Sequence, residues 1–195
     1  MKANLATIAP KVSTVVAANH PPVLATMEVL ADKGVIADGQ LVAKDSDGKL
    51  IAHGKVTGAA MTGTIDGANK DFAATLDPAP VLPGSVRIDN NNAAAQFLVD
   101  DGHGRLEGDG SGTVNYASGE VAATFTTAPA AGKTVLVAHK TKPVGVNVNE
   151  CDSGEDDTAL VLKHGTVRTK GLLTGATAPD AEDLAALEAI GIYAA

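Results

Sequence analysis

The middle of the chain consists of short stretches in which hydrophobic and polar positions alternate, separated by turns rich in Gly, Asn and Asp. In one such stretch Val121, Ala123 and Phe125 occupy every second position. A period of two is typical of β-strands that bury one face. Because several such stretches follow one another between residues 57 and 140, the pattern predicts a β-sandwich or barrel-like domain there. Tyr116 and Phe125 flank one of its tight turns, and we expect them to pair across that hairpin.

Residues on either side of this segment also favour strands. Residues 41–43 and 50–52 are apolar and flank Asp45-Ser46-Asp47-Gly48, a composition that favours a tight turn, so they predict a β-hairpin. Residues 144–148 and 159–162 predict two further strands around an acidic turn at 152–157. Residues 23–34 fit either a helix or a strand, and we favour the extended form.

The C-terminus changes to a helical period. Asp180 is a suitable N-cap, and Gly191 is placed to end the helix, so the pattern predicts a helix over residues 180–190. The opposite side is expected to be acidic, with Glu182, Asp183 and Glu188. We predict that the apolar side packs in the core or between subunits, through Leu184, Leu187, Ile190 and Ile192.

The first 20 residues show no hydrophobic period. Pro10 and Pro21 disfavour a helix in the residue before each of them. Lys2 and Lys11 are the charged residues of this segment, which contains no acidic residue. The segment therefore predicts an extended N-terminal arm, whose candidate contact residues are Leu5, Ile8, Pro10, Val12, Val15 and Val16.

Charge and composition narrow the possible functions. The formal net charge is −8, which argues against binding of nucleic acid because phosphates need Lys and Arg. No apolar run approaches the ~20 residues of a membrane span, so we expect no membrane insertion. The single cysteine excludes a disulfide framework within the chain. Three Phe, two Tyr and no Trp offer few stacking surfaces for sugars or bases.

The sequence lacks the residues that known catalytic and metal-binding motifs require at their fixed spacings. No two of the five histidines lie three or four residues apart, so a helical zinc pair is excluded. EF-hand loops started at Asp45 or Asp100 place Val56 or Ser111 at the twelfth position, where an acidic ligand is required. The glycine-rich segment 108–112 lacks the Lys-Ser/Thr of a phosphate loop. Acidic neighbours raise the thiol pKa of Cys151, which disfavours a nucleophile. We therefore expect no enzyme activity, no metal and no cofactor.

Three blocks resemble one known family. They are GQLVAKDSDGKL at residues 39–50, ALVL followed by GTV within residues 159–167, and APDAEDL followed by IGI within residues 178–192. In this order they are similar to the lambda-type head decoration (cement) proteins of bacteriophages. The first two blocks lie far apart here, so the resemblance implies an inserted β-domain at residues 57–140. The decoration-type β-domain is then discontinuous, at residues 21–56 and 141–195, and residues 1–20 are a capsid-binding arm.

The resemblance also implies a function. It predicts a structural protein of the virion, assembled in the host cytoplasm and bound as a homotrimer to the major capsid protein at three-fold positions on the outer surface of the capsid. The alternative is a surface-displayed binding module whose inserted β-domain recognises a host glycan or protein. Under either hypothesis the fold class is mainly β, with a C-terminal helix and an extended arm.

Overall fold

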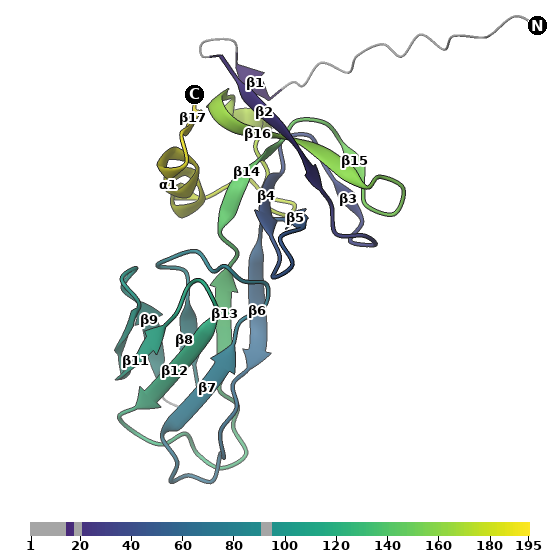
Figure 1. Cartoon of the computed structure of the whole chain (residues 1–195). Coiled ribbons are helices and arrows are strands. Elements are labelled where there is room, and N and C mark those ends of the chain that lie inside the picture. The colour runs from purple at the N-terminus through teal and green to yellow at the C-terminus, as the bar shows by residue number, and fades with distance from the viewer. Residues whose placement is uncertain (1–14, 18–20, 91–94) are drawn as a thin grey trace, which may run out of the picture.

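The computed structural model describes residues 15–17, 21–90 and 95–195. The fold is mainly β, with a nearly closed barrel-like sheet and a C-terminal α-helix, which confirms the predicted fold class. Figure 1 shows two units joined end to end, with the barrel-like sheet below and the sheet that carries the helix above. Most of the predicted N-terminal arm lies outside the described residues.

The lower unit, here called the barrel, is an eight-stranded antiparallel sheet. Its spatial order is β6-β13-β8-β9-β10-β11-β12-β7. A bridge between Thr62 and Ala73 brings the two ends of this order together and nearly closes the sheet. The strands are β6 (Lys55–Ala60), β7 (Asp71–Thr75), β8 (Arg87–Asp89), β9 (Phe97–Asp100), β10 (Arg105–Gly108), β11 (Gly110–Val114), β12 (Glu120–Phe125) and β13 (Leu136–Lys140).

Alternating side chains fill the interior of the barrel. In β12 every second residue is buried, as the sequence pattern predicts. Phe72 and Phe125 meet edge to face with ring centroids 6.0 Å apart. The expected pairing of Tyr116 with Phe125 is wrong, because the register places Phe125 opposite Gly110. Tyr116 instead donates a hydrogen bond to the buried Asp100 at 2.6 Å.

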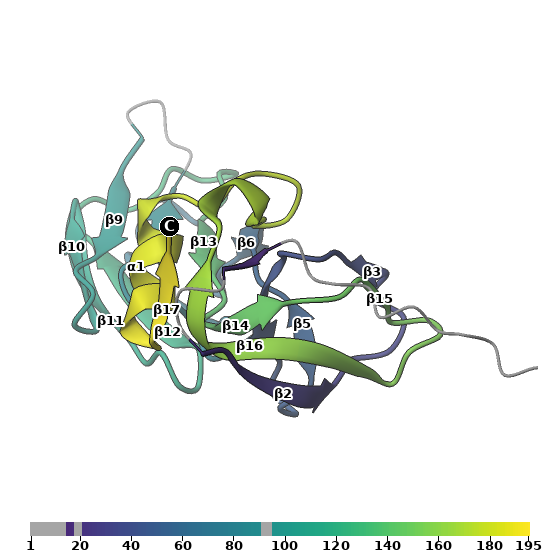
Figure 2. The same ribbon diagram turned by 90° about the horizontal axis from the view of Figure 1, so that it is seen from above.

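The upper unit, here called the seven-stranded unit, has the order β1-β16-β14-β4-β5, with β2 and β17 also paired to β16. Figure 2 shows β2 running along β16 on one side of the sheet, away from the helix. A separate two-stranded ribbon pairs β3 (Val35–Ile36) with β15 (Cys151–Asp152). The seven strands are β1 (Val16–Ala17), β2 (Val23–Glu28), β4 (Leu41–Lys44), β5 (Leu50–Ala52), β14 (Pro143–Asn147), β16 (Thr158–Val167) and β17 (Ile192–Ala194).

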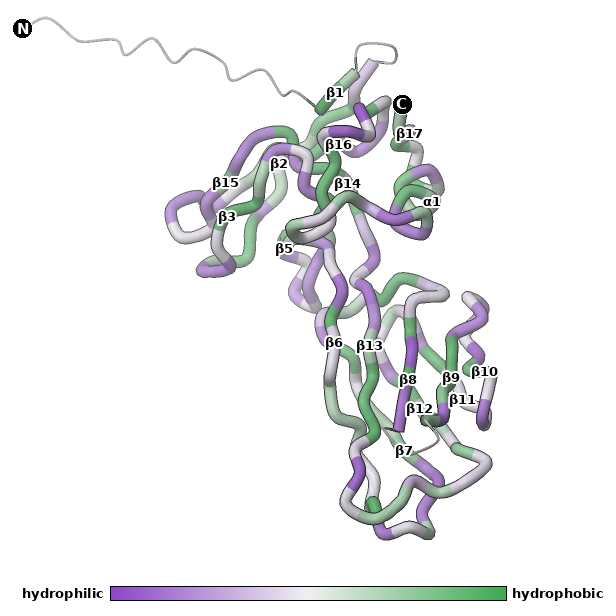
Figure 3. Tube along the Cα trace, turned by 180° about the vertical axis from the view of Figure 1, so that it is seen from behind, coloured by the Kyte–Doolittle hydropathy of each residue, from purple (hydrophilic) through white to green (hydrophobic). Residues whose placement is uncertain are grey.

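The segments outside the barrel that the sequence predicts as strands are also strands in the structure. The predicted hairpin is present as β4 and β5, with Val42 opposite Ala52. The ambiguous segment starting at residue 23 is the extended strand β2. Figure 3 shows hydrophobic stretches along β14 and β16 in this unit and along β13 in the barrel, so each unit has its own apolar interior.

The described part of the chain begins inside the predicted arm. Val15 is 1% exposed and packs over Gly39 and Gly171, where a side chain at either glycine would collide with it or crowd it. Its carbonyl accepts a hydrogen bond from the backbone N–H of Arg168 at 2.8 Å. Val16 then pairs with Val167. The structure therefore places Val15 and Val16 in the seven-stranded unit, whereas Leu5, Ile8, Pro10 and Val12 lie outside the described residues.

The predicted C-terminal helix is α1 (Ala181–Ala189), which packs against β14 and β17. Asp180 caps it, and Gly191 at φ +83° follows its end. Leu187 and Ile192 are fully buried within the chain, whereas Leu184 and Ile190 are half-buried against the same core. Among the four predicted packing residues, only Leu184 and Ile190 thus keep exposed surface that a second subunit could contact.

We expect the barrel to fold when it is expressed alone as residues 55–141. Its ends are adjacent because Lys55 pairs with Lys140, and its core belongs to the barrel alone. Far-ultraviolet circular dichroism and thermal unfolding of the fragment test this. A β-sheet spectrum with a cooperative transition is the expected result, and a random-coil spectrum would contradict it.

Leu187→Asp should lower the free energy of unfolding of the whole chain by about 3 kcal/mol or more, because it places an unpaired carboxylate in a fully buried position. Urea unfolding monitored by circular dichroism measures the change. Ala185→Asp is the matched control, since Ala185 is exposed on the same helix. Equal stability of the two variants would show that Leu187 is not a core residue.

Candidate functional site

Chemistry-bearing side chains gather at the junction between the two units. The chain crosses the junction twice, through His53 and Gly54 between β5 and β6, and through Thr141 and Lys142 between β13 and β14. The two linkers contact each other, since the backbone N–H of Gly54 donates to the Thr141 hydroxyl at 3.3 Å. The N-terminus of α1 lies against this crossing and supplies three carboxylates.

His53 is fully buried and connects one linker to the other and to the helix. Its Nδ1 lies 3.1 Å from Oγ1 of Thr141, and its Nε2 lies 3.1 Å from Oδ1 of Asp183. Because an ionised carboxylate only accepts, Nε2 carries the hydrogen given to Asp183; in the neutral imidazole Nδ1 is then the acceptor, and the Thr141 hydroxyl, which accepts from Gly54, donates to it. This tautomer satisfies every polar atom of the chain of hydrogen bonds.

The carboxylate of Asp183 accepts four hydrogen bonds although the residue is only 1% exposed. Oδ1 accepts from Lys140 Nζ at 2.9 Å and from His53 Nε2 at 3.1 Å. Oδ2 accepts from the Thr174 hydroxyl at 3.0 Å and from the backbone N–H of Asp180 at 3.2 Å. Burial favours the neutral form and would raise the pKa of Asp183, but the hydrogen bonds from Lys140 and His53 hold it below its ordinary value.

Lys140 provides the cationic partner from the end of β13. Its Nζ lies 2.6 Å from Asp180, 2.9 Å from Asp183 and 3.0 Å from Glu182. Burial alone would lower the pKa of Lys140, but the hydrogen bonds to the three carboxylates outweigh it and raise the pKa. The ammonium is therefore held in its charged form. It has no free base character and does not suit a catalytic amine.

Local sequence explains why the carboxylates meet at this point. Asp180 accepts from the backbone N–H groups of Glu182 and Asp183, and Asp183 bonds back to Asp180, which forms a capping box. This arrangement starts the helix and fixes both side chains. It also places negative charge at the positive end of the helix dipole, where carboxylates are stabilised.

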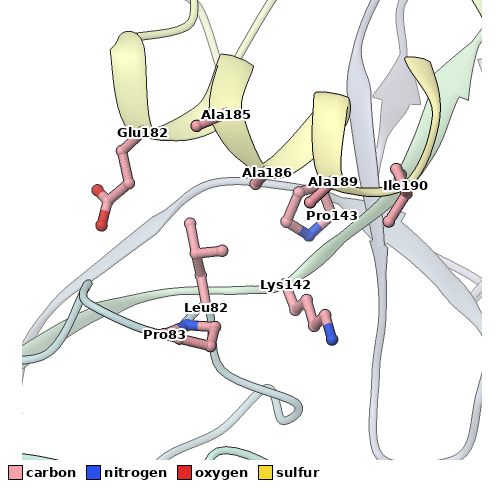
Figure 4. A pocket seen from close by; sticks show the side chains of 9 residues that line it. All are labelled: Leu82, Pro83, Lys142, Pro143, Glu182, Ala185, Ala186, Ala189 and Ile190. Atoms are coloured by element: carbon pink, nitrogen blue, oxygen red, sulfur yellow. The ribbon is translucent and has the colours of Figure 1, made fainter. Parts of the chain in front are cut away.

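A cleft of about 370 Å³ opens beside the polar network, between α1 and the barrel. Figure 4 shows Ala185, Ala186 and Ala189 of the helix on one side and Leu82 and Pro83 of the barrel on the other. Glu182 and Lys142 lie at opposite ends of it. The Glu182 carboxylate is already paired with Lys140, so the cleft offers a mostly apolar surface rather than a charged one.

The carboxylates in the excluded loop that starts at Asp100 accept hydrogen bonds within the barrel. Asp101 accepts from the backbone N–H groups of His103 and Arg105, which lowers its pKa. Asp109 accepts from the backbone N–H of Phe97 at 2.8 Å. Asp100 accepts from Tyr116, whose pKa is raised to about 12 by burial and by this bond. In the described ranges no three metal-ligating side chains lie close enough together to hold an ion.

Two other candidate groups are also buried. Cys151 is 3% exposed, and burial raises its thiol pKa, with Asp156 and Asp152 acting in the same direction. His139 lies in the barrel at 1% exposure, and burial lowers its pKa, opposed by the Pro78 carbonyl and by Asp77. Both side chains are therefore almost completely buried.

Sequence reasoning missed the junction, although one signal was available. Asp183 was assigned to the acidic outer face of the helix, and the structure shows that this was wrong. Asp183 lies four residues before Leu187 and seven before Ile190, a spacing that places all three on one face. An acid on the apolar face of a predicted helix indicates a buried partner, but no sequence signal identified His53 or Lys140 as that partner.

Comparison with known proteins identifies no relative. No family model matches the chain, and neither a curated protein nor a solved structure matches it. In the part of the chain that the structure describes, no helix has the length and apolar character needed to cross a bilayer.

Asp183→Asn should lower the free energy of unfolding at pH 7 by about 3–5 kcal/mol, because Lys140 loses its buried partner and an amide N–H₂ replaces an acceptor. Stability that depends on a carboxylate of lowered pKa is present above its unfolded pKa and is lost as pH falls below the ordinary value of 3.8. The free energy of unfolding should therefore fall less between pH 7 and pH 3 in Asp183→Asn than in the parent.

Urea unfolding between pH 7 and pH 3 measures both effects. Glu188→Gln is the matched control, because Glu188 is exposed on the same helix. If Asp183→Asn unfolds like Glu188→Gln at every pH, the network makes no contribution to stability.

Proposed function

We propose that this chain is a structural capsid decoration protein. It would stabilise the head of a tailed phage by binding as trimers to the major capsid protein at three-fold positions on the outer surface of the virion. The proposal starts from the three sequence blocks that resemble lambda-type head decoration proteins. The structural observation that supports it most is that the start of the described chain and the barrel lie at opposite ends of the molecule (Figure 1).

The chain enters the described structure at the end of the seven-stranded unit that lies away from the barrel (Figure 1). There β1 and β17 both pair with the last residues of β16, Val16 and Ala194 each opposite Val167. An attachment segment preceding Val15 would therefore leave from one end, while the barrel points away from the other. A shell-bound protein that carries a projecting domain needs this separation.

Exposed apolar side chains lie near the same end. Val23 is 53% exposed and Tyr193 is 47% exposed. Both adjoin His164, since Val23 is its cross-strand partner and the Tyr193 ring meets it edge to face at 6.5 Å. An apolar surface beside the start of the chain suits contact with the shell or with a second subunit.

The N-terminal segment is the proposed attachment element. An extended segment can add as a strand to the edge of a sheet, where main-chain hydrogen bonds provide the affinity. We expect a variant lacking residues 2–13 to fold normally, because Val15 and β1 remain, and to lose binding to expanded capsids. Co-sedimentation with capsids that lack this protein measures the binding.

Lys33→Gln is a control variant, since it changes one exposed charge of the same unit and leaves the N-terminal segment intact. Binding of the truncated protein with the affinity of the parent would contradict the role of the segment. Failure of the parent itself to bind any capsid, together with a monomeric mass by light scattering, would contradict the proposed function.

The alternative is a binding module for a host glycan or protein, and one feature of the barrel favours it. Phe97 is 37% exposed on β9, and the guanidinium of Arg87 lies 4.7 Å from the centre of its ring. Val99 on the same strand is 43% exposed. Binding of the barrel to a glycan array, abolished by Phe97→Ala, would favour this alternative.

A further inference from the structure

We infer that the polar network at the junction is a latch that fixes the orientation of the barrel relative to the seven-stranded unit. The latch consists of Lys140 at the end of β13, of His53 in the β5–β6 linker, and of Asp180, Glu182 and Asp183 at the start of α1. The two units then move as one body, and the barrel is held at one angle. This inference does not depend on what the protein binds.

The covalent connections alone do not set that angle. Two short linkers lie side by side and bond to each other through Gly54 and Thr141. Two adjacent extended linkers resist twisting. They can still bend out of the plane that contains both of them, as hinges at the ends of strands do. A contact away from the linkers is needed to stop the bending.

Lys140 makes that contact. It belongs to the barrel, because it ends β13 and pairs with Lys55 of β6. Its side chain reaches α1 of the other unit, where its three ammonium hydrogens face three carboxylates at 2.6–3.0 Å. Charge-assisted bonds of this kind are directional and are stronger than neutral ones, so a change of angle would break several of them together.

Apolar side chains of both units also meet at the junction. Leu82 of the barrel, which is 6% exposed, and Pro83 face the alanines of α1 across the cleft (Figure 4). Apolar contacts are non-directional, so they select an angle less sharply than charge-assisted bonds do.

Within the described residues, Lys140 bonds the barrel directly to the start of the helix. Of the three carboxylates, Asp183 is buried, whereas the Asp180 and Glu182 side chains are 59% and 38% exposed. Buried ion pairs contribute little net stability compared with apolar replacements, but in some proteins they select one arrangement over others.

Double electron–electron resonance between spin labels tests the latch in the full chain. Labels at Thr134→Cys in the barrel and Glu155→Cys in the other unit, both exposed, report the distance between the units. The background carries Cys151→Ala so that the native thiol is not labelled. We expect a single narrow distance distribution for the parent and a distribution at least about twofold wider for Lys140→Met, since the hinge is released.

Lys142→Met is the matched control. Lys142 lies in the same linker and is exposed, so its replacement should leave the width unchanged. Asp180→Ser combined with Glu182→Gln is a second test variant, because it removes two carboxylates while Ser keeps the helix cap. It should broaden the distribution to an intermediate width, and it decides the question if circular dichroism shows that Lys140→Met does not fold.

A broad distribution in the parent would overturn the inference. So would a folded Lys140→Met variant with the width of the parent, or, where that variant does not fold, a folded double variant with the width of the parent.

Discussion

The carboxylate of Asp183 is the point at which the separate parts of this molecule meet. It receives hydrogen bonds from β13 through Lys140, from the β5–β6 linker through His53, from the loop before α1 through Thr174, and from the helix cap at Asp180. Each donor comes from a different segment, so the carboxylate can be satisfied only when all four are in place. Removing one partner leaves a buried charge or donor unpaired, and this makes the arrangement cooperative.

Removing the charged groups of such a network from water costs free energy. Neither unit needs the network in its interior, and it lies at the junction between them. Each unit already has an apolar interior that holds its strands together. At the junction, Leu82 and Pro83 of the barrel face small alanines on α1 across a cleft. Directional bonds from one charged residue to three carboxylates can define an orientation more sharply than such apolar contacts.

Sequence patterns predicted the elements far better than their contacts. Alternation identified the strands of residues 57–140, and the turn at Asp45–Gly48 identified the β4–β5 hairpin, because both signals are local. The meeting of His53 with Asp183 joins positions 130 residues apart, and the closure of the barrel through Thr62 and Ala73 depends on the register of every strand between them. Tyr116 packs against the barrel core as the pattern predicts, but its hydrogen-bond partner Asp100 lies 16 residues away and has no local signal.

The position of the barrel within the chain has a simple geometric basis. A segment can be inserted into a folded unit at little cost when its two ends lie side by side, and Lys55 and Lys140 do so as partners in neighbouring strands. β5 and β14, which join the two linkers, both pair with β4 in the seven-stranded unit, so the strands that receive the linkers are held without help from the barrel. The inserted unit therefore adds a surface without rearranging the sheet that carries it. The charged contact from Lys140 to α1 adds to the two chain crossings, and in the inferred latch it determines where that surface points.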